Sequence, residues 1–471
     1  MNNFHFIISG LISLCLLANP QYISVSEATP LHLEDVLAHL EDRLPKVLSV
    51  IELQKSSEAL ARSAMGHWDP QLQSKGISIP TGQYVGQSLS ASLVQPTPLW
   101  GLSINAGYRI GKGDFPSYKD YKTLSQGELT AGLTLPLLKG GRIDEGRAEI
   151  QGAHYLQQRE KCNRKVTLIQ ASLEASHVYW DWVAKGLLVK VQVELLTMAE
   201  RRTDGLSERV REGSLPPIIL KDNERLVLER RAELIEAQRG LLSAAYKLGV
   251  YYRDDRGEMI LVRDEELPQA LPKHAEPREV IDEVSTESAI QSHPLNCILQ
   301  REISAAEVKV SLAETKALPQ LDLSAFVAKD IGDGPQQMSP TELGAGVTLK
   351  MPLLLRRARG ELESARAKVN SLRHKLRQQV DLLTASLSRA IVNLEATHAR
   401  SLIAATQVEV ARSLVEAERI KLEEGASDLI VLNLRELSYA KAEALEIKAV
   451  IDYLKAHADY LSARGELGRS R

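Results

Sequence analysis

Few residues in this sequence have the types and spacing that catalysis, metal binding or cofactor binding requires. It contains no metal-binding HExxH pattern, no GxSxG nucleophile pattern and no P-loop, and no cysteine pair has metal-ligand spacing. Gly107, Gly111 and Gly113 precede a polar loop rather than a helix, so they do not form a dinucleotide fingerprint. The stretch LLKGGR at 137–142 lacks the Lys-Ser/Thr ending of a phosphate site, which favours a strand-to-helix joint. We therefore expect no catalytic residue, cofactor or metal, and a protein that is not an enzyme.

Three residues at two turns are the remaining candidates for a functional site. Gly213 and Gly425 each follow a glutamate at the end of a predicted long helix, and Asp428 stands three residues after the second glycine. Glycine suits a helix C-terminal turn because it adopts the left-handed backbone without a steric penalty. Asp428 is placed to cap a returning helix that begins near Leu429, which is the interpretation that the residues favour.

The elements that hold these turns occur twice in the chain. The segment around Pro45 and Pro70 is repeated around Pro294 and Pro319, and both pairs of prolines are 249 residues apart. The stretch AGLTLPLLKGGRIDEGRAEI at 131–150 is repeated as AGVTLKMPLLLRRARGELESARAKV at 345–369. Each half therefore predicts a helix, a strand region, a very long helix, a turn and a returning helix.

The longest predicted helices need an unusual architecture. No proline interrupts residues 142–211 or 357–423, and about 1.5 Å per residue makes each helix about 100 Å long. A heptad spacing of apolar residues predicts a coiled-coil seam on the second of them: Leu362, Val369, Leu376, Leu383 and Ala390. The predicted first repeat spans 29–250, with helices at 33–65, 142–211 and 218–248. The predicted second repeat spans 278–471, with helices at 278–317, 357–423 and 429–467. A predicted linker at 251–277 joins the two repeats.

The strand regions, at 71–136 and 320–352, alternate apolar and polar residues. Leu321, Leu323, Ala325 and Val327 share one face, and the first copy holds a similar run from Trp100 to Ile110. Alternating runs of about 9–11 residues are typical of outer-membrane strands, with lipid on one side and water on the other. The first region is about twice as long as the second, so it contains either a larger loop or an extra hairpin, and both alternatives stay open.

The N-terminus and the composition bear on the compartment. The apolar run from Phe6 to Ala18 has the length of a signal-peptide core, and small residues before Thr29 predict cleavage after residue 28. No later run reaches the length of a transmembrane helix. A net charge of −3 gives no reason to expect nucleic-acid binding. Cys162 and Cys297 lie at similar depth along helices, so a bridge is conceivable, although two unpaired cysteines are the preferred interpretation.

Taken together, these features resemble the TolC-like outer-membrane efflux protein family. The resemblance rests on WDPQL and LPQLDLS before the strands, on GELTAGLTLPLLKGGRIDEGRAEI, on RDDRGEMI in the linker and on LEEGASDLIVLNLRELSYAKAEAL at the second turn. It implies a mostly α-helical fold with a transmembrane β-barrel portion, in which a homotrimer builds one β-barrel continued by a periplasmic α-helical barrel.

The same resemblance implies a function and partners. Members of this family are passive exit ducts of tripartite efflux or type I secretion systems. They dock with a periplasmic adaptor (membrane fusion) protein and an inner-membrane pump of the RND or ABC type. Acidic residues on the tip of the second repeat line an aperture in the family. Three copies of Asp428 would form such a constriction, but Val431 and Leu434 stand where some relatives have aspartates.

A second class of function competes with the channel. A soluble periplasmic coiled-coil scaffold or adaptor would also contain long helices. An adaptor normally has one helical hairpin flanked by β-rich domains, not two full repeats.

Overall fold

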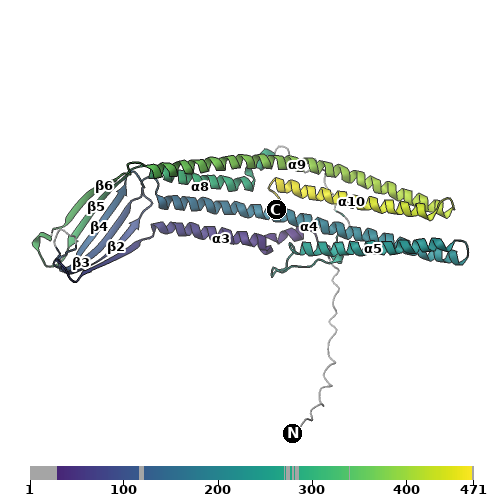
Figure 1. Cartoon of the computed structure of the whole chain (residues 1–471), viewed down its shortest axis with the longest axis horizontal. Coiled ribbons are helices and arrows are strands. Elements are labelled where there is room, and N and C mark those ends of the chain that lie inside the picture. The colour runs from purple at the N-terminus through teal and green to yellow at the C-terminus, as the bar shows by residue number, and fades with distance from the viewer. Residues whose placement is uncertain are drawn as a thin grey trace, which may run out of the picture.

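The computed structural model describes residues 29–115, 121–269, 271, 276–277, 281, 286–338 and 340–468. The predicted signal peptide at 1–28 and part of the predicted linker at 251–277 lie outside these residues. Figure 1 shows an elongated molecule with a sheet at one end, helices along its length and two helical turns at the far end.

The first repeat begins with three short-to-medium helices and ends in a long hairpin. These helices are α1 (Leu33–Ala38), α2 (Leu40–Arg43) and α3 (Pro45–Met65); the hairpin consists of α4 (Glu145–Arg211) and α5 (Pro217–Gly249). Asp144 begins α4 because its carboxylate accepts a hydrogen bond of 2.7 Å from the Arg147 backbone N–H, an arrangement that satisfies one free donor of the first turn.

The second repeat contains α7 (Thr286–Ser292), α8 (Pro294–Lys316), α9 (Arg356–Glu423) and α10 (Leu429–Ala463). The prediction of one helix over 278–317 is wrong, because α7 and α8 are separated at His293. Pro294 has no N–H and restricts the residue before it to an extended backbone, so a new helix begins there. The predicted helix over 429–467 ends early, at Ala463, and Gly465 follows in the left-handed region with φ of 75°.

Six antiparallel strands form one sheet in the order of the sequence. They are β1 (Gln71–Ile79), β2 (Gly86–Pro96), β3 (Ser103–Gly113), β4 (Glu128–Pro136), β5 (Gln320–Asp330) and β6 (Glu342–Lys350). The first repeat thus supplies four strands, which resolves the alternative in favour of an extra hairpin. Trp100 and Leu102 were predicted in a strand, but they lie in the β2–β3 turn, where Trp100 has φ of 51°.

The helices form one layer rather than a bundle around a central core. Near the sheet, α4 packs between α3 and α8, and α9 packs on the other side of α8. Toward the far turns the order becomes α5, α4, α10 and α9. The main apolar cluster is at mid-length, where Tyr179 and Trp182 of α4 are fully buried and the Tyr179 hydroxyl donates to the Leu31 carbonyl at 2.8 Å.

A disulfide joins the two repeats. Cys162 of α4 and Cys297 of α8 are bridged, with their Cα atoms 6.1 Å apart, so the preferred interpretation of two unpaired cysteines is wrong. The physical reason is the side-by-side packing of α4 and α8, which brings helix faces 135 residues apart in sequence within bonding reach.

Candidate functional site: a two-faced sheet and two helical tips

The sheet separates apolar from polar side chains across β2 to β6, whereas β1 contributes only Leu72 to the apolar face and places Ile77 and Ile79 on the other. In the centre of the sheet, Ala325 pairs with Leu133 on one side and with Ala345 on the other. The register extends this apolar face to every strand: Leu72; Leu89, Ala91 and Leu93; Ile104, Ala106 and Tyr108; Leu129, Ala131 and Leu133; Leu323, Ala325 and Val327; Leu343, Ala345, Val347 and Leu349. The sequence prediction of a shared apolar face is therefore confirmed by the register.

The opposite face is polar and rich in glycine. Ser324 pairs with Thr134 and Gly346, and its hydroxyl donates to the Gly346 carbonyl at 3.3 Å. Arg109 of β3 and Glu128 of β4 form an ion pair on this face. A sheet with one apolar and one polar face is suited to stand between lipid and water.

The two predicted glycines lie at the far ends of the hairpins, as Figure 1 shows for the α4–α5 and α9–α10 turns. Gly213 has φ of 74° and Gly425 has φ of 76°, so both need the left-handed backbone that glycine adopts freely. The N–H of Ala426 donates to the Lys421 carbonyl at 2.8 Å, and the N–H of Ser214 donates to the Arg209 carbonyl at 2.9 Å. These bonds close the last turn of each long helix.

Asp428 is the N-cap of α10. Its carboxylate accepts a hydrogen bond of 2.9 Å from the Val431 backbone N–H, and its own backbone is extended. The cap interpretation is thus confirmed. The cap leaves the charge of the carboxylate in place, so it is compatible with the predicted role at an aperture.

A buried polar contact holds the two hairpins together near the tips. Arg202 of α4 donates to Glu436 of α10 at 2.6 Å and also to Asn433. The two charged side chains are only 12% and 10% exposed. Sequence reasoning missed this pair because each residue is one of many charges on a long helix, and only the packing of α4 on α10 distinguishes them.

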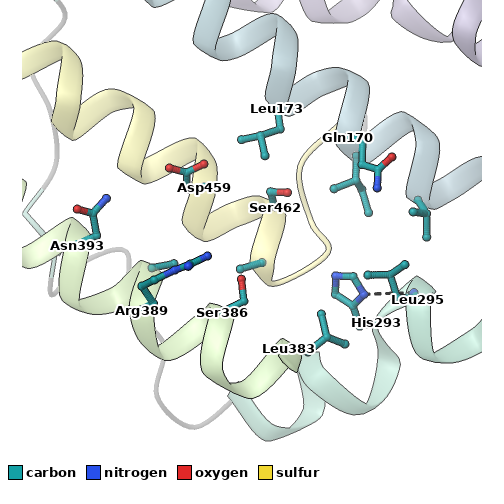
Figure 2. A pocket seen from close by; sticks show the side chains of 14 residues that line it. Gln170, Leu173, His293, Leu295, Leu383, Ser386, Arg389, Asn393, Asp459 and Ser462 are labelled. Atoms are coloured by element: carbon teal, nitrogen blue, oxygen red, sulfur yellow. Dashed lines mark hydrogen bonds between the residues drawn. The ribbon is translucent and has the colours of Figure 1, made fainter. Parts of the chain in front are cut away.

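A cavity of about 510 Å³ lies between α4, α8, α9 and α10 (Figure 2). Its histidine, His293, caps α8: the Leu295 N–H donates to His293 Nδ1 at 3.2 Å. Burial lowers the pKa of His293, against a smaller opposing effect of a hydrogen bond with the Ser462 backbone, so the ring is neutral near pH 7. Arg389 and Asp459 also line the cavity (Figure 2). Among the described residues, no side-chain hydroxyl or thiol that could act as a nucleophile is hydrogen-bonded to the His293 ring. This arrangement supports a structural role for the histidine.

Two further observations limit the chemistry. Within the part of the chain that the structure describes, no group of His, Cys, Asp and Glu side chains could hold a metal ion. Among the same residues, no helix has both the length and the apolar character required to cross a bilayer.

Comparison with known protein families finds a match in the second repeat. Residues 299–470 match the family model described as outer membrane efflux protein. The resemblance predicted from the sequence is thereby confirmed for most of the second repeat. No curated protein matches the chain by sequence.

Solved structures extend the similarity to the fold of nearly the whole chain. The outer-membrane channel OprN is 15% identical, with a TM-score of 0.66 over 92% of this chain and 89% of that one. VceC from Vibrio cholerae is 14% identical, with a TM-score of 0.65 over 92% and 96% of the two chains. The open-state MtrE outer membrane channel of Neisseria gonorrhoeae is 12% identical, with a TM-score of 0.63 over 92% and 88%. Both repeats therefore have the fold of these outer-membrane proteins.

Proposed function

We propose that this chain is one subunit of an outer-membrane exit duct that serves a tripartite efflux or type I secretion system. The observation that carries the proposal is the two-faced sheet joined directly to helices of 67 and 68 residues. The apolar face suits the bilayer, and helices about 100 Å long are suited to cross the periplasm. The family match of residues 299–470 supports the same function.

We further propose that three copies close the duct. Strands β1 and β6 are each paired on one side only, and they form the two edges of the six-stranded sheet. An unpaired strand edge is costly in lipid because its backbone groups find no hydrogen-bond partner there. Joining β6 of one copy to β1 of the next would satisfy both edges and continue the apolar face around a barrel.

The helical layer has matching open edges. Exposed leucine and isoleucine side chains recur every seven residues on α5, at Leu228, Ile235 and Leu242. The outer edge of α9 exposes Ile403 and Val410 with the same spacing. Apolar heptad stripes on two free edges are suited to pack against each other between copies, as in a coiled coil.

The proposed partners are a periplasmic adaptor and an inner-membrane pump of the RND or ABC type, which the tips at Gly213 and Gly425 would face. We propose that Asp428 contributes its charge to the aperture at that end. The alternative of a soluble scaffold or adaptor fits less well, because two long hairpins share one sheet and no separate β-rich domains flank a single hairpin within the described residues.

Membrane fractionation combined with native mass spectrometry tests the proposal. The mature chain should remain with outer membranes after a high-salt and urea wash, should be released by detergent, and should have three times the mass of one chain. Recovery in the soluble periplasmic fraction as a monomer would favour the scaffold instead. Ion conductance across a planar bilayer after reconstitution tests the duct itself.

A further inference from the structure

Between α4 and α9, the helical layer consists of α10 and α8 placed end to end (Figure 1). Both helices contact α4 on one side and α9 on the other. The end of α10 at Ala463 meets the start of α8 at Pro294, because a Cβ on the following Gly465 would lie 3.0 Å from the His293 ring and 3.1 Å from Pro294. The cavity of about 510 Å³ lies at this junction between two helix ends (Figure 2).

The matching junction of the first repeat is filled with side chains. In that repeat α5 ends at Gly249 and α3 begins at Pro45. Val36 of α1 and Leu40 of α2 are fully buried in the apolar cluster between these helix ends, beside Trp182 of α4. Close packing of this kind is the ordinary state of a protein interior. The open space at the second junction is therefore a specific difference between the two repeats.

The cavity has an apolar side and a polar side. Apolar side chains come from α4, at Ile169 and Leu173, from α8, at Leu295, and from α9, at Leu383. The polar side chains gather toward α10 (Figure 2). A cavity of about 510 Å³ with a largely apolar lining and a few polar groups has the size and character of a small-molecule site. Its occupant should therefore have an apolar body and a polar group at one end.

Two charged side chains line the cavity, and only one of them has a partner. The Asp459 carboxylate of α10 lies 3.1 Å from His177 Nε2 of α4. Arg389 of α9 points toward α10 (Figure 2), and no described residue forms an ion pair with it. The hydroxyls of Ser386 and Ser462 line the same side of the cavity. Because a guanidinium forms paired hydrogen bonds with the oxygens of a carboxylate or a similar oxyanion, the unpaired cation favours an anionic group on the occupant.

We propose that this cavity is a binding site for a small amphipathic anion. The apolar body of the ligand packs against α4 and α8, and its carboxylate or sulfonate group accepts hydrogen bonds from Arg389. A bound ligand contacts helices of both repeats and replaces the side chains that fill the first junction, so it braces the meeting point of α8 and α10. The inference uses only the packing of four helices within one chain, and it holds whether or not three copies form a duct.

Two fluorescent dyes with the same ring system separate the anionic group from the apolar body. Anilinonaphthalenesulfonate carries a sulfonate, and phenylnaphthylamine has the same rings without it. Each dye is titrated against the full chain in a neutral detergent, and the binding that a variant loses is the binding at the cavity. We expect Arg389→Gln to weaken saturable binding of the sulfonate dye by about tenfold or more, the effect of losing a hydrogen-bonded charge partner, and to leave the neutral dye unchanged. Arg389→Lys, which keeps the charge, should retain part of the affinity.

Two further variants locate the bound dye. Ser386 is half-buried and lines the cavity, so Ser386→Phe should fill the space and remove the cavity component of both dyes. Arg377→Gln removes an exposed cation earlier on the same helix, and it should leave the binding of both dyes unchanged. If Ser386→Phe fails to fold, the comparison of Arg389→Gln with Arg377→Gln still decides the result, because both replace an arginine on the surface of α9.

Three outcomes would overturn the proposal. Equal weakening by Arg389→Gln and Arg377→Gln would mean that the dye responds to the overall charge of the helix. Equal affinity of the unmodified chain for the two dyes would mean that Arg389 recognises no anion. Sulfonate-dye binding that survives both Arg389→Gln and Ser386→Phe would place the dye on another apolar surface. Failure of the chain to enter outer membranes would overturn the proposed function and leave this measurement untouched.

Discussion

Arginine on the apolar face of the sheet should impair assembly in the membrane. Ala325 is the middle residue of β5, with five residues of the strand on each side, so about 16 Å of strand lies on either side at about 3.3 Å per residue. Its neighbours Leu133 and Ala345 belong to the same apolar face. We expect Ala325→Arg to cost about 2–4 kcal/mol per chain, the cost of an arginine near the bilayer midplane.

The adjacent residue provides the matched control. Ser324 has the same depth but lies on the polar face, between Thr134 and Gly346. Ser324→Arg exchanges one weak hydrogen bond for a charge in water, and should cost about 1 kcal/mol or less. Urea titration of the protein folded into phospholipid vesicles measures both values, and Val347→Arg on β6 repeats the test on the apolar face.

The comparison can fail in an informative way. Equal costs for Ala325→Arg and Ser324→Arg would mean that both faces meet the same solvent. The sheet would then be an amphipathic surface of a water-soluble protein, and the reasoning from the two faces would be refuted.

Three further predictions concern the helices. Cys162→Ser/Cys297→Ser should lower the free energy of unfolding by up to about 5 kcal/mol, because the bridge closes a loop of 135 residues. Chemical denaturation measures this loss of stability, and reducing the bridge of the unmodified chain with dithiothreitol should produce the same loss. Arg202→Met should cost about 3–5 kcal/mol by leaving Glu436 buried without its partner, whereas adding Glu436→Leu should restore most of the loss in a double-mutant cycle. Asp428→Asn keeps a capping side chain but removes the charge, so single-channel recordings should show reduced cation preference at unchanged stability; unchanged selectivity would leave the residue as a cap alone.

The sequence predicts most of the architecture because the signals are periodic. An alternation of two residues assigns Leu323, Ala325 and Val327 to one face whatever their partners are, and a long proline-free stretch predicts α4 and α9 to within a few residues. The tip turns could also be predicted, since Gly213 and Gly425 have a local conformational reason to be glycine.

Features that depend on contacts between the repeats could not be predicted. The Cys162–Cys297 bridge and the Arg202–Glu436 pair arise only once α4 packs beside α8 and α10. Trp100 was assigned to a strand because its apolar neighbours alternate, and periodicity carries no information about a left-handed backbone in a turn. The family comparison covers residues 299–470, so for the first repeat the similarity to known proteins is one of fold alone.

The disulfide has a mechanical consequence for the duct. It pins α4 to α8 at Cys162, and α4 continues for 49 residues beyond this point to Arg211. At about 1.5 Å per residue, the portion beyond the cross-link is about 75 Å long, so a bend of about 5° of this portion, together with the helices packed on it, would carry the tip through about 6 Å. In the proposed duct, the cross-link would stiffen the wall near the sheet, and a small flexure beyond it would be enough to widen or narrow the far end.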